Sequence, residues 1–438
     1  MLDRARAGRP VFATAMVIAL TLMPLPTAAS EGAARPNILL IISDYMGYQD
    51  TEPYGASDVS TPAISRLAEE GVRFTNFYAA APVCGPARAA LYTGRYPASI
   101  GFETNIRTAD DGLDASIPTL SSRLNAAGYR TALYGKWHLG YPLSTQPRAH
   151  GYEEFLGHLH WTISYYSHVN DAGEPGLYEH DRLVSRDGYL TDILTDEAVG
   201  FIGRHRDAPF FLTLSYNAAL PPYQPPGIPE SRWDEGWDVN QASRQDVTSM
   251  VERMDEGIGR VLDALDEHAL TEKTLVIYLY DHGGRHLVDP GPLFHGFANL
   301  FEGGIRIPAI VRFPGRVPEN RSIAEPAIAM DLTATILHAT GLGSQAESLD
   351  GIDLMPLMRG EAPTVPRQFY WQADLYEFGR QRAIREGRYK YLEHGNTQFL
   401  FDLERDVGER HNLFNEHTDV VNRLRAALTR WQSGGNDD

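Results

Sequence analysis

The stretch that decides the fold is PNILLIIS, from Pro36 to Ser43. Its unbroken apolar run is typical of a strand buried on both faces of a parallel sheet. Four further segments are predicted to be strands: RTALYGKW (130–137), PFFLTLSY (209–216), TLVIYLYD (274–281) and IPAIVRF (307–313). Helical periodicity separates them, notably in TPAISRLAEEGVRF (61–74), which Thr61 is expected to cap, and in VTSMVERMDEGIGRVLDAL (247–265). This alternation predicts an α/β sheet covered by helices on both faces.

The pattern changes near the C-terminus. After DGIDLMPLMRG (350–360) come two short strand-like segments, FYWQA (369–373) and GRYKYLEH (387–394), then a turn-rich segment and a helix over about 420–431. We therefore predict a large domain over residues 30–362 and a smaller α+β subdomain over 363–438.

The first residues have the layout of a secretory signal. Three arginines precede an apolar run over residues 11–25, and the small residues PTAAS follow. The run is shorter than the roughly 20 residues of a membrane span, so we predict a signal peptide over 1–29, with an uncleaved anchor as the alternative. The mature chain is then exported, periplasmic or extracellular, and free of the membrane. Its formal charge of −18 argues against a nucleic-acid partner.

Polar residues follow several of the predicted strands. Asp44 comes after the first, Lys136 and His138 lie at the end of the second, and Asp281 and His282 follow the fourth. Ligands of open α/β sheets bind at the carboxyl ends of the strands, so these side chains are expected to meet. Two carboxylates there could hold a hard cation such as calcium, whereas the imidazole by itself points equally to zinc or manganese.

The only cysteine of the chain, Cys84, lies in APVCGPARAALYTGRYP (81–97). It cannot form an internal disulfide. It is therefore either a small buried apolar residue or a reactive group.

The motif CGPAR (84–88), continued by LYTGR (91–95), resembles the Cys-x-Pro-x-Arg signature of type I sulfatases. GKWHLG, DHGG, FEGGIRIP and LFDLERDVGERHNL extend the resemblance along the mature chain. It implies an alkaline-phosphatase-like α/β/α sandwich with a smaller C-terminal α+β subdomain. It also implies that a maturation enzyme oxidises Cys84 to formylglycine, whose hydrate attacks the sulfur of a sulfated small molecule or polysaccharide.

The resemblance also implies roles for individual residues. Arg88 would orient the formylglycine, and Lys136 and His138 would bind the nucleophile and the sulfate. Asp44, Asp281 and His282 would form the calcium site.

Three positions depart from the sulfatase pattern. Tyr45 replaces the second of two paired aspartates, Leu220 aligns with the histidine that would protonate the leaving oxygen, and Phe297 aligns with a sulfate-binding lysine. Arg285, His286 and His295 are candidate substitutes. The aromatic segments HLHWTISYYSH (158–168) and DLYEF (374–378) are candidates for the pocket lip or for ordinary packing.

This pattern leaves three alternative hypotheses for the function. We predict a sulfatase with an altered site that hydrolyses an aryl or carbohydrate sulfate. The alternatives are a non-catalytic homologue that binds sulfated ligands, and a related phosphoester or phosphonate hydrolase.

Overall fold

The computed structural model of the chain describes residue 8 and residues 35–106, 111–227, 240–361, 366–375 and 378–434. The chain divides into two units, Met1–Ala34 and Arg35–Asp438, and the elements described below belong to the second. Apart from residue 8, the predicted signal peptide lies outside the described residues. The boundary predicted between residues 362 and 363 also falls outside them, so it stays a prediction.

The large layer is an 11-stranded mixed sheet. Across the sheet its strands run in the order β10 (Arg321–Ile323), β2 (Val72–Tyr78), β9 (Arg306–Arg312), β8 (Thr274–Tyr280), β1 (Asn37–Ser43), β7 (Phe210–Ser215), β3 (Arg130–Lys136), β4 (Glu154–His158), β5 (Tyr178–Glu179) and β6 (Arg182–Leu183), while β11 (Ala327–Ile328) pairs with β2.

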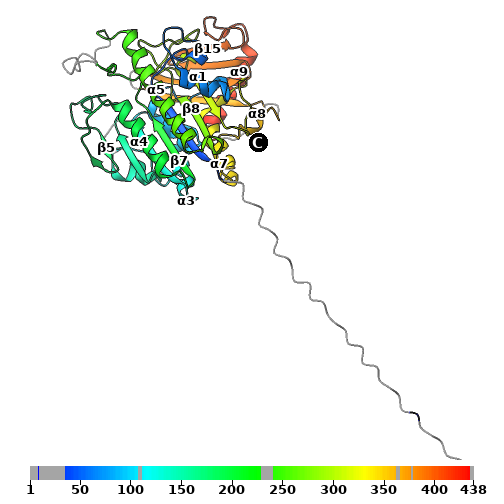
Figure 1. Ribbon diagram of the computed structural model, residues 1–438. Coiled ribbons are helices and arrows are strands. Elements are labelled where there is room, and N and C mark those ends of the chain that lie inside the picture. The colour runs from blue at the N-terminus through cyan, green and yellow to red at the C-terminus, as the bar shows by residue number, and fades with distance from the viewer. Residues whose placement is uncertain are drawn as a thin grey trace, which may run out of the picture. The chain divides into compact units, whose positions relative to one another are not determined.

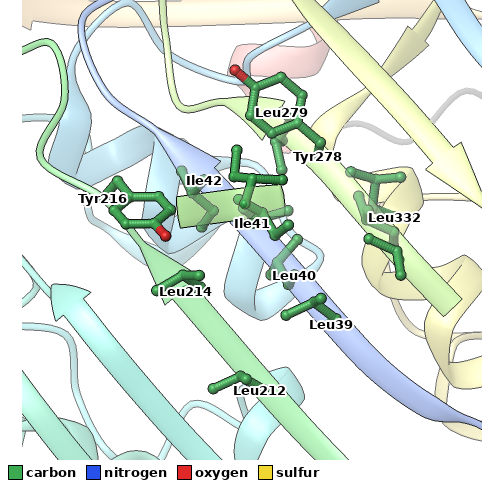
Figure 2. Packing of buried hydrophobic residues seen from close by; sticks show 14 of the residues in the cluster. Leu39, Leu40, Ile41, Ile42, Leu212, Leu214, Tyr216, Tyr278, Leu279 and Leu332 are labelled. Carbon is green, nitrogen blue, oxygen red and sulfur yellow. The ribbon is translucent and has the colours of Figure 1, made fainter. Parts of the chain in front are cut away.

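The centre of this sheet is parallel. Strand β1 pairs in parallel with β7 on one side and β8 on the other, and β3 continues the parallel set beyond β7. Every residue of β1, β7 and β8 is buried, which explains their apolar sequences. Figure 2 shows this core, where side chains of β1 lie among Leu212 and Leu214 of β7, Tyr278 and Leu279 of β8, and Leu332 of α7. Four parallel carboxyl ends therefore meet at one edge of the sheet.

The helices form two groups. In the first, α5 packs against α1 and α4, and α4 and α5 lie side by side in front of the strands in Figure 1. In the second, α2 packs against α3 and α7. The helix bounds are α1 (Pro62–Glu69), α2 (Cys84–Thr93), α3 (Leu120–Ala126), α4 (Leu190–Arg204), α5 (Arg244–Glu267), α6 (Glu302–Ile305), α7 (Ala329–Ala339), α8 (Met355–Arg359) and α9 (Thr418–Gln432).

Thr61 is the N-cap residue of α1 and Pro62 its first residue, as predicted, but the expected cap bond is missing. Thr61 precedes α1 but makes no side-chain cap bond to it, because its hydroxyl instead accepts a hydrogen bond from the backbone N–H of Glu52. The carboxylate of Asp255, on α5, accepts the N–H groups of Ala63 and Ile64 at 2.9 and 2.8 Å. The N-terminus of α1 is thus capped by a neighbouring helix, which the local sequence does not reveal.

A second, four-stranded antiparallel sheet carries the C-terminal part of the chain. It consists of β12 (Gln368–Leu375), β13 (Gly379–Glu386), β14 (Tyr389–His394) and β15 (Thr397–Asp402), and α9 packs on β13 and β14. Buried Lys390 of β14 lies 2.9 Å from carboxylate oxygens of both Glu302 and Glu409. This ionic group fastens the small sheet to the main one, and the predicted α/β fold with a smaller C-terminal subdomain is confirmed.

Candidate active site

The first residue of α2 is Cys84. Val83 before it is extended, so Cys84 opens the helix, and its side chain is 3% exposed. Its sulfur lies 3.0 Å from Nε2 of His282 and 4.0 Å from Oδ1 of Asp44. The positive end of the helix dipole also favours negative charge at this position. Cys84 is therefore a buried side chain in a polar setting suited to a nucleophile.

Arg88 lies one turn further along the same face of α2 and ties the site together. It is fully buried and donates to Asp281 at 3.0 Å, to Asp44 at 3.2 Å and to the Ser215 hydroxyl at 2.6 Å. It also donates to the carbonyl of Lys136 at 3.0 Å. One planar guanidinium thus fixes the ends of four neighbouring strands.

Lys136 ends β3, and its ammonium lies 2.5 Å from Oδ2 of Asp44. Burial opposes the charge of Lys136, but the negative charges of Asp44, Cys84 and Asp281 together outweigh burial and raise the lysine pKa above its ordinary value. Two buried carboxylates titrate apart when they share a site. Burial and Asp281 raise the pKa of Asp44, whereas His282, Arg88 and Lys136 overcome burial and lower that of Asp281.

His282 follows Asp281 and contacts Cys84. Burial opposes its protonation, but the Asp281 carboxylate and the Cys84 sulfur outweigh burial and raise the pKa of His282 to about 10. His138 behaves in the opposite way, because burial and the charges of Lys136 and Arg88 hold its pKa well below the ordinary value. Among the described residues, Nδ1 of His138 has no hydrogen-bond partner, so it is available to a ligand.

The structure brings a possible metal-binding group together. One ligand atom each from Asp44, Cys84, Asp281 and His282 lies within 4.8 Å of the others, and all four residues are buried. Imidazole and carboxylate together fit a divalent cation. Calcium needs more oxygen ligands, which this group reaches only if a formylglycine oxygen stands where the Cys84 sulfur lies and the sulfate ester adds its own. The donors are thus compatible with a metal ion and do not by themselves select calcium.

The first and third departures from the sulfatase pattern are in contact. The rings of Tyr45 and Phe297 lie 5.2 Å apart, and the Phe297 ring lies 5.2 Å from that of His282. Tyr45 also meets His282 edge-on at 6.2 Å. An acid and a base of the family pattern are therefore exchanged together for two aromatic rings that pack on one histidine.

The second departure leaves no histidine at its place. Leu220 is buried, and its carbonyl accepts a hydrogen bond from Tyr165. The candidate substitutes Arg285, His286 and His295 are exposed, and among the described contacts none reaches Cys84.

The lip segment 158–168 places His158 inside the protein. His158 lies opposite Lys136 in the register of β4 and β3, and it is fully buried. One of its ring nitrogens contacts the side-chain oxygen of Asn217, and the other lies 3.0 Å from the carbonyl of His160. Burial and the charge of Lys136 lower its pKa to about 3. His158 is thus uncharged near neutral pH, and both of its ring nitrogens already contact oxygen atoms of the protein.

Ser215 and Asn217, which the sequence analysis did not select, support the site. Ser215 ends β7, where its hydroxyl accepts from Arg88 and donates to the carbonyl of Lys136 at 2.9 Å. A polar residue at the end of a buried strand, as at Asp44 and Lys136, was the available signal. Both were overlooked because serine and asparagine at strand ends are common turn residues.

Comparison with known proteins identifies the family. The profile described as Sulfatase matches residues 36–342, and the profile described as N-sulphoglucosamine sulphohydrolase, C-terminal, matches residues 295–434. The chain belongs to the sulfatase family. It is 31% identical to N-acetylgalactosamine-6-sulfatase of Canis lupus familiaris, over 93% of this chain and 88% of the relative, and 30% identical to steryl-sulfatase of Mus musculus, over 92% and 83%. This sulfatase is accordingly a sulfuric ester hydrolase.

Solved structures agree with this assignment. The crystal structure of Ps i-CgsB superimposes with a TM-score of 0.83 at 29% identity, covering 91% of this chain and 93% of that one. Ps i-CgsB has also been solved in complex with k-i-k-neocarrahexaose, with the same similarity to this sulfatase. BT4656, solved with D-glucosamine-2-N,6-O-disulfate, shares the fold at a TM-score of 0.76, 23% identity and coverage of 92% and 99%. The predicted alkaline-phosphatase-like sandwich is confirmed.

Proposed function

We propose that this sulfatase uses a formylglycine made from Cys84 to hydrolyse a carbohydrate or aryl sulfate. The observation that carries the proposal is the position of Cys84. Cys84 is the first residue of α2, and its sulfur lies 3.0 Å from Nε2 of His282. One turn further along the helix, buried Arg88 donates to both carboxylates of the site. The departures at Tyr45, Leu220 and Phe297 are the reason for the competing non-catalytic hypothesis, and the relatives named as sulfatases count against it.

The Cys84 sulfur stands in for an oxygen of the mature group. In hydrated formylglycine the same carbon carries two hydroxyl groups. One hydroxyl attacks the sulfur of the ester, the ester S–O bond breaks, and the alcohol leaves with a proton. The second hydroxyl then loses its proton, the aldehyde C=O re-forms and sulfate departs, after which water restores the hydrate. Because Cys84 is 3% exposed in the folded chain, the maturation enzyme must act before folding.

The surrounding residues have distinct proposed roles. Arg88 positions the nucleophile and holds the two carboxylates, through the hydrogen bonds that it donates to them. Lys136, buried and charged, stabilises negative charge that develops on the ester oxygens. His138 offers its unpartnered Nδ1 to the sulfate. His282 lies beside the nucleophile, with its Nε2 3.0 Å from the Cys84 sulfur, and is assigned to the cation site.

We further propose that Asp44, Asp281 and His282 hold a divalent cation, calcium by family resemblance. When bound, the cation supplies positive charge next to the reacting sulfate. Its support here is the convergence of buried donor atoms at the nucleophile.

The chemistry of the leaving group indicates which sulfate esters should react fastest. General acid catalysis is usually worth roughly 10²–10⁴ in rate, and Leu220 cannot supply it. A phenolic sulfate needs this help least, so aryl sulfates should react faster than alkyl ones in a direct comparison. Carbohydrate sulfates remain in the proposal because Ps i-CgsB binds an oligosaccharide.

We propose export to the periplasm or the outside of the cell on the basis of residues 4–29. Among the described residues, no helix has the length and apolar character needed to cross a membrane.

The test is release of inorganic sulfate from a panel of aryl and carbohydrate sulfates, with phosphate esters in parallel. The protein is coexpressed with a maturation enzyme, supplied with calcium, and compared with Cys84→Ala. Sulfate release that the variant abolishes is expected. Equal release by both proteins, or no release although mass spectrometry finds the aldehyde, would overturn the proposal. Faster release of phosphate would favour a phosphoester hydrolase.

A further inference from the structure

Two arginines and two histidines gather where the segment 285–301 meets the small sheet. We call Arg285, His295, His394 and Arg410 the cationic rim. The two arginines and His295 are exposed, and His394 is half-buried. The chain as a whole carries a formal charge of −18, so a local group of cations is a departure from its general character.

Aromatic rings hold the two arginines in place. The guanidinium of Arg285 lies over the ring of Phe378 at 5.6 Å, and that of Arg410 lies over Phe294 at 4.6 Å. Among the described residues, neither arginine has a carboxylate partner, although ion pairs hold other arginines of the chain, such as Arg130, Arg204 and Arg260. The cations are therefore positioned yet not neutralised, and a planar guanidinium in this state is suited to a sulfate or carboxylate.

The two histidines connect the arginines. The ring of His295 lies 4.1 Å from that of Phe294 and 4.9 Å from that of Phe301, which in turn lies 6.4 Å from His394. His394 is hydrogen-bonded to the carbonyl of Phe378 at 3.0 Å. Partial burial, with His394, Arg285 and Arg410 nearby, lowers the pKa of His295. The rim is thus one continuous surface.

A short series of contacts joins this surface to the nucleophile. Phe378 and Phe297 pack against the same small apolar cluster around Val83, the residue before Cys84. Phe297 contacts His282, and His282 contacts the sulfur of Cys84. Phe297 and Phe378 thus lie between the nucleophile and Arg285 in this series of contacts.

We propose that the cationic rim binds a second anionic group of the substrate, so that the preferred substrate is an oligosaccharide with negative charge on the unit next to the reacting sulfate. This rests on the proposed function and adds a substrate class to it. A sulfate and a carboxylate share the required chemistry. Exposed charge contacts are weak individually, and each arginine should contribute about fivefold in affinity.

The experiment measures binding to Cys84→Ala protein, which does not turn over. Three disaccharides of one skeleton are titrated: one with a single sulfate, one with a second sulfate on the neighbouring ring, and one with a carboxylate there. Arg285→Gln and Arg410→Gln are compared with Arg206→Gln as a matched control. The side chain of Arg206 is 57% exposed, and the residue precedes β7, so it lies near the amino ends of the strands, whereas the nucleophile lies at their carboxyl ends.

The dianionic ligands are expected to bind more tightly than the single sulfate, and each rim variant should reduce this preference about fivefold. The control should keep the preference, and added salt should weaken it. The ratio between the two dianionic ligands tells which second group is favoured. Equal affinity for all three ligands, or a preference that both rim variants retain, would overturn the proposal. Turnover of a monosulfated ester by the formylglycine protein reports on the proposed function separately.

Discussion

The contact between Tyr45 and Phe297 predicts that these two positions are energetically coupled. Tyr45→Asp restores the second acid of the sulfatase pattern, and Phe297→Lys restores the lysine. Each single change introduces one unpaired charge beside a buried ionic group, in which Arg88 and Lys136 face Asp44 and Asp281. The double change introduces two opposite charges side by side.

The magnitudes follow from burial and distance. Tyr45 is 6% exposed, and an uncompensated charge in a buried position costs about 3–5 kcal/mol. Phe297 is half-buried, so a lysine there keeps part of its hydration and costs less. The two rings are 5.2 Å apart, and at that distance opposite charges attract by about 3 kcal/mol at an effective dielectric constant of 20. The double variant should therefore recover about 2–3 kcal/mol of the summed losses.

The assay is urea unfolding of the wild type, both single variants and the double variant in buffer with a metal chelator. The coupling free energy is the difference between the double variant and the sum of the singles. Tyr45→Asn with Phe297→Lys is the matched control, because it changes the shape but adds no carboxylate. Additivity within about 0.5 kcal/mol would refute the argument that the two rings replace an acid and a base together.

Three further predictions concern charge. Arg88→Lys should lower kcat/KM for a sulfate ester by at least about 10²-fold, because an ammonium cannot replace the four hydrogen bonds of the guanidinium; sulfate release from aldehyde-verified protein measures it, and activity near wild type would contradict it. Burial, helped by Glu302 and opposed by Lys390, raises the pKa of Glu409 from 4.5 to about 7. The contribution of Glu409 to the unfolding free energy is then complete below pH 4.5 and is lost as the pH rises through 7, by up to about 3 kcal/mol. Glu409→Gln should therefore flatten the dependence of the unfolding free energy on pH over this range. An unchanged slope would count against this prediction. Saturating calcium should raise the thermal midpoint of the wild type but not of Asp281→Asn, and a shift with manganese alone would indicate that His282 has changed the metal preference.

Much of the fold could be predicted because apolar runs and helical periodicity within short segments indicate strands and helices. The run at Pro36–Ser43 indicated a central parallel strand, and β1 occupies Asn37–Ser43 with every residue buried. The periodicity over 247–265 indicated a helix, and α5 spans Arg244–Glu267. Strands β2 and β4 were not predicted from pattern. Residues 72–78 alternate with polar side chains and directly follow a helix, and residues 154–158 form a run of only five.

The candidate site could be predicted in part. Asp44, Lys136 and Asp281 were found because they follow strands that are recognisable from their apolar residues. Ser215 and Asn217 stand at the end of an equally clear strand but carry ordinary turn side chains. His158 was assigned to a possible lip because sequence does not tell that it pairs with Lys136 across two strands.

The sequence by itself determined the class of fold and showed that Cys84 and its neighbouring site residues match the sulfatase motifs. It also determined the three departures from the sulfatase pattern. These depend on residue type and on short spacings, which the chain carries directly. Only the tertiary structure decided that Tyr45 and Phe297 touch, that Asp255 caps α1, and that aromatic contacts link Arg285 and Arg410 to His295 and His394. Such contacts join residues far apart in the chain, and packing of the whole core decides which distant side chains meet.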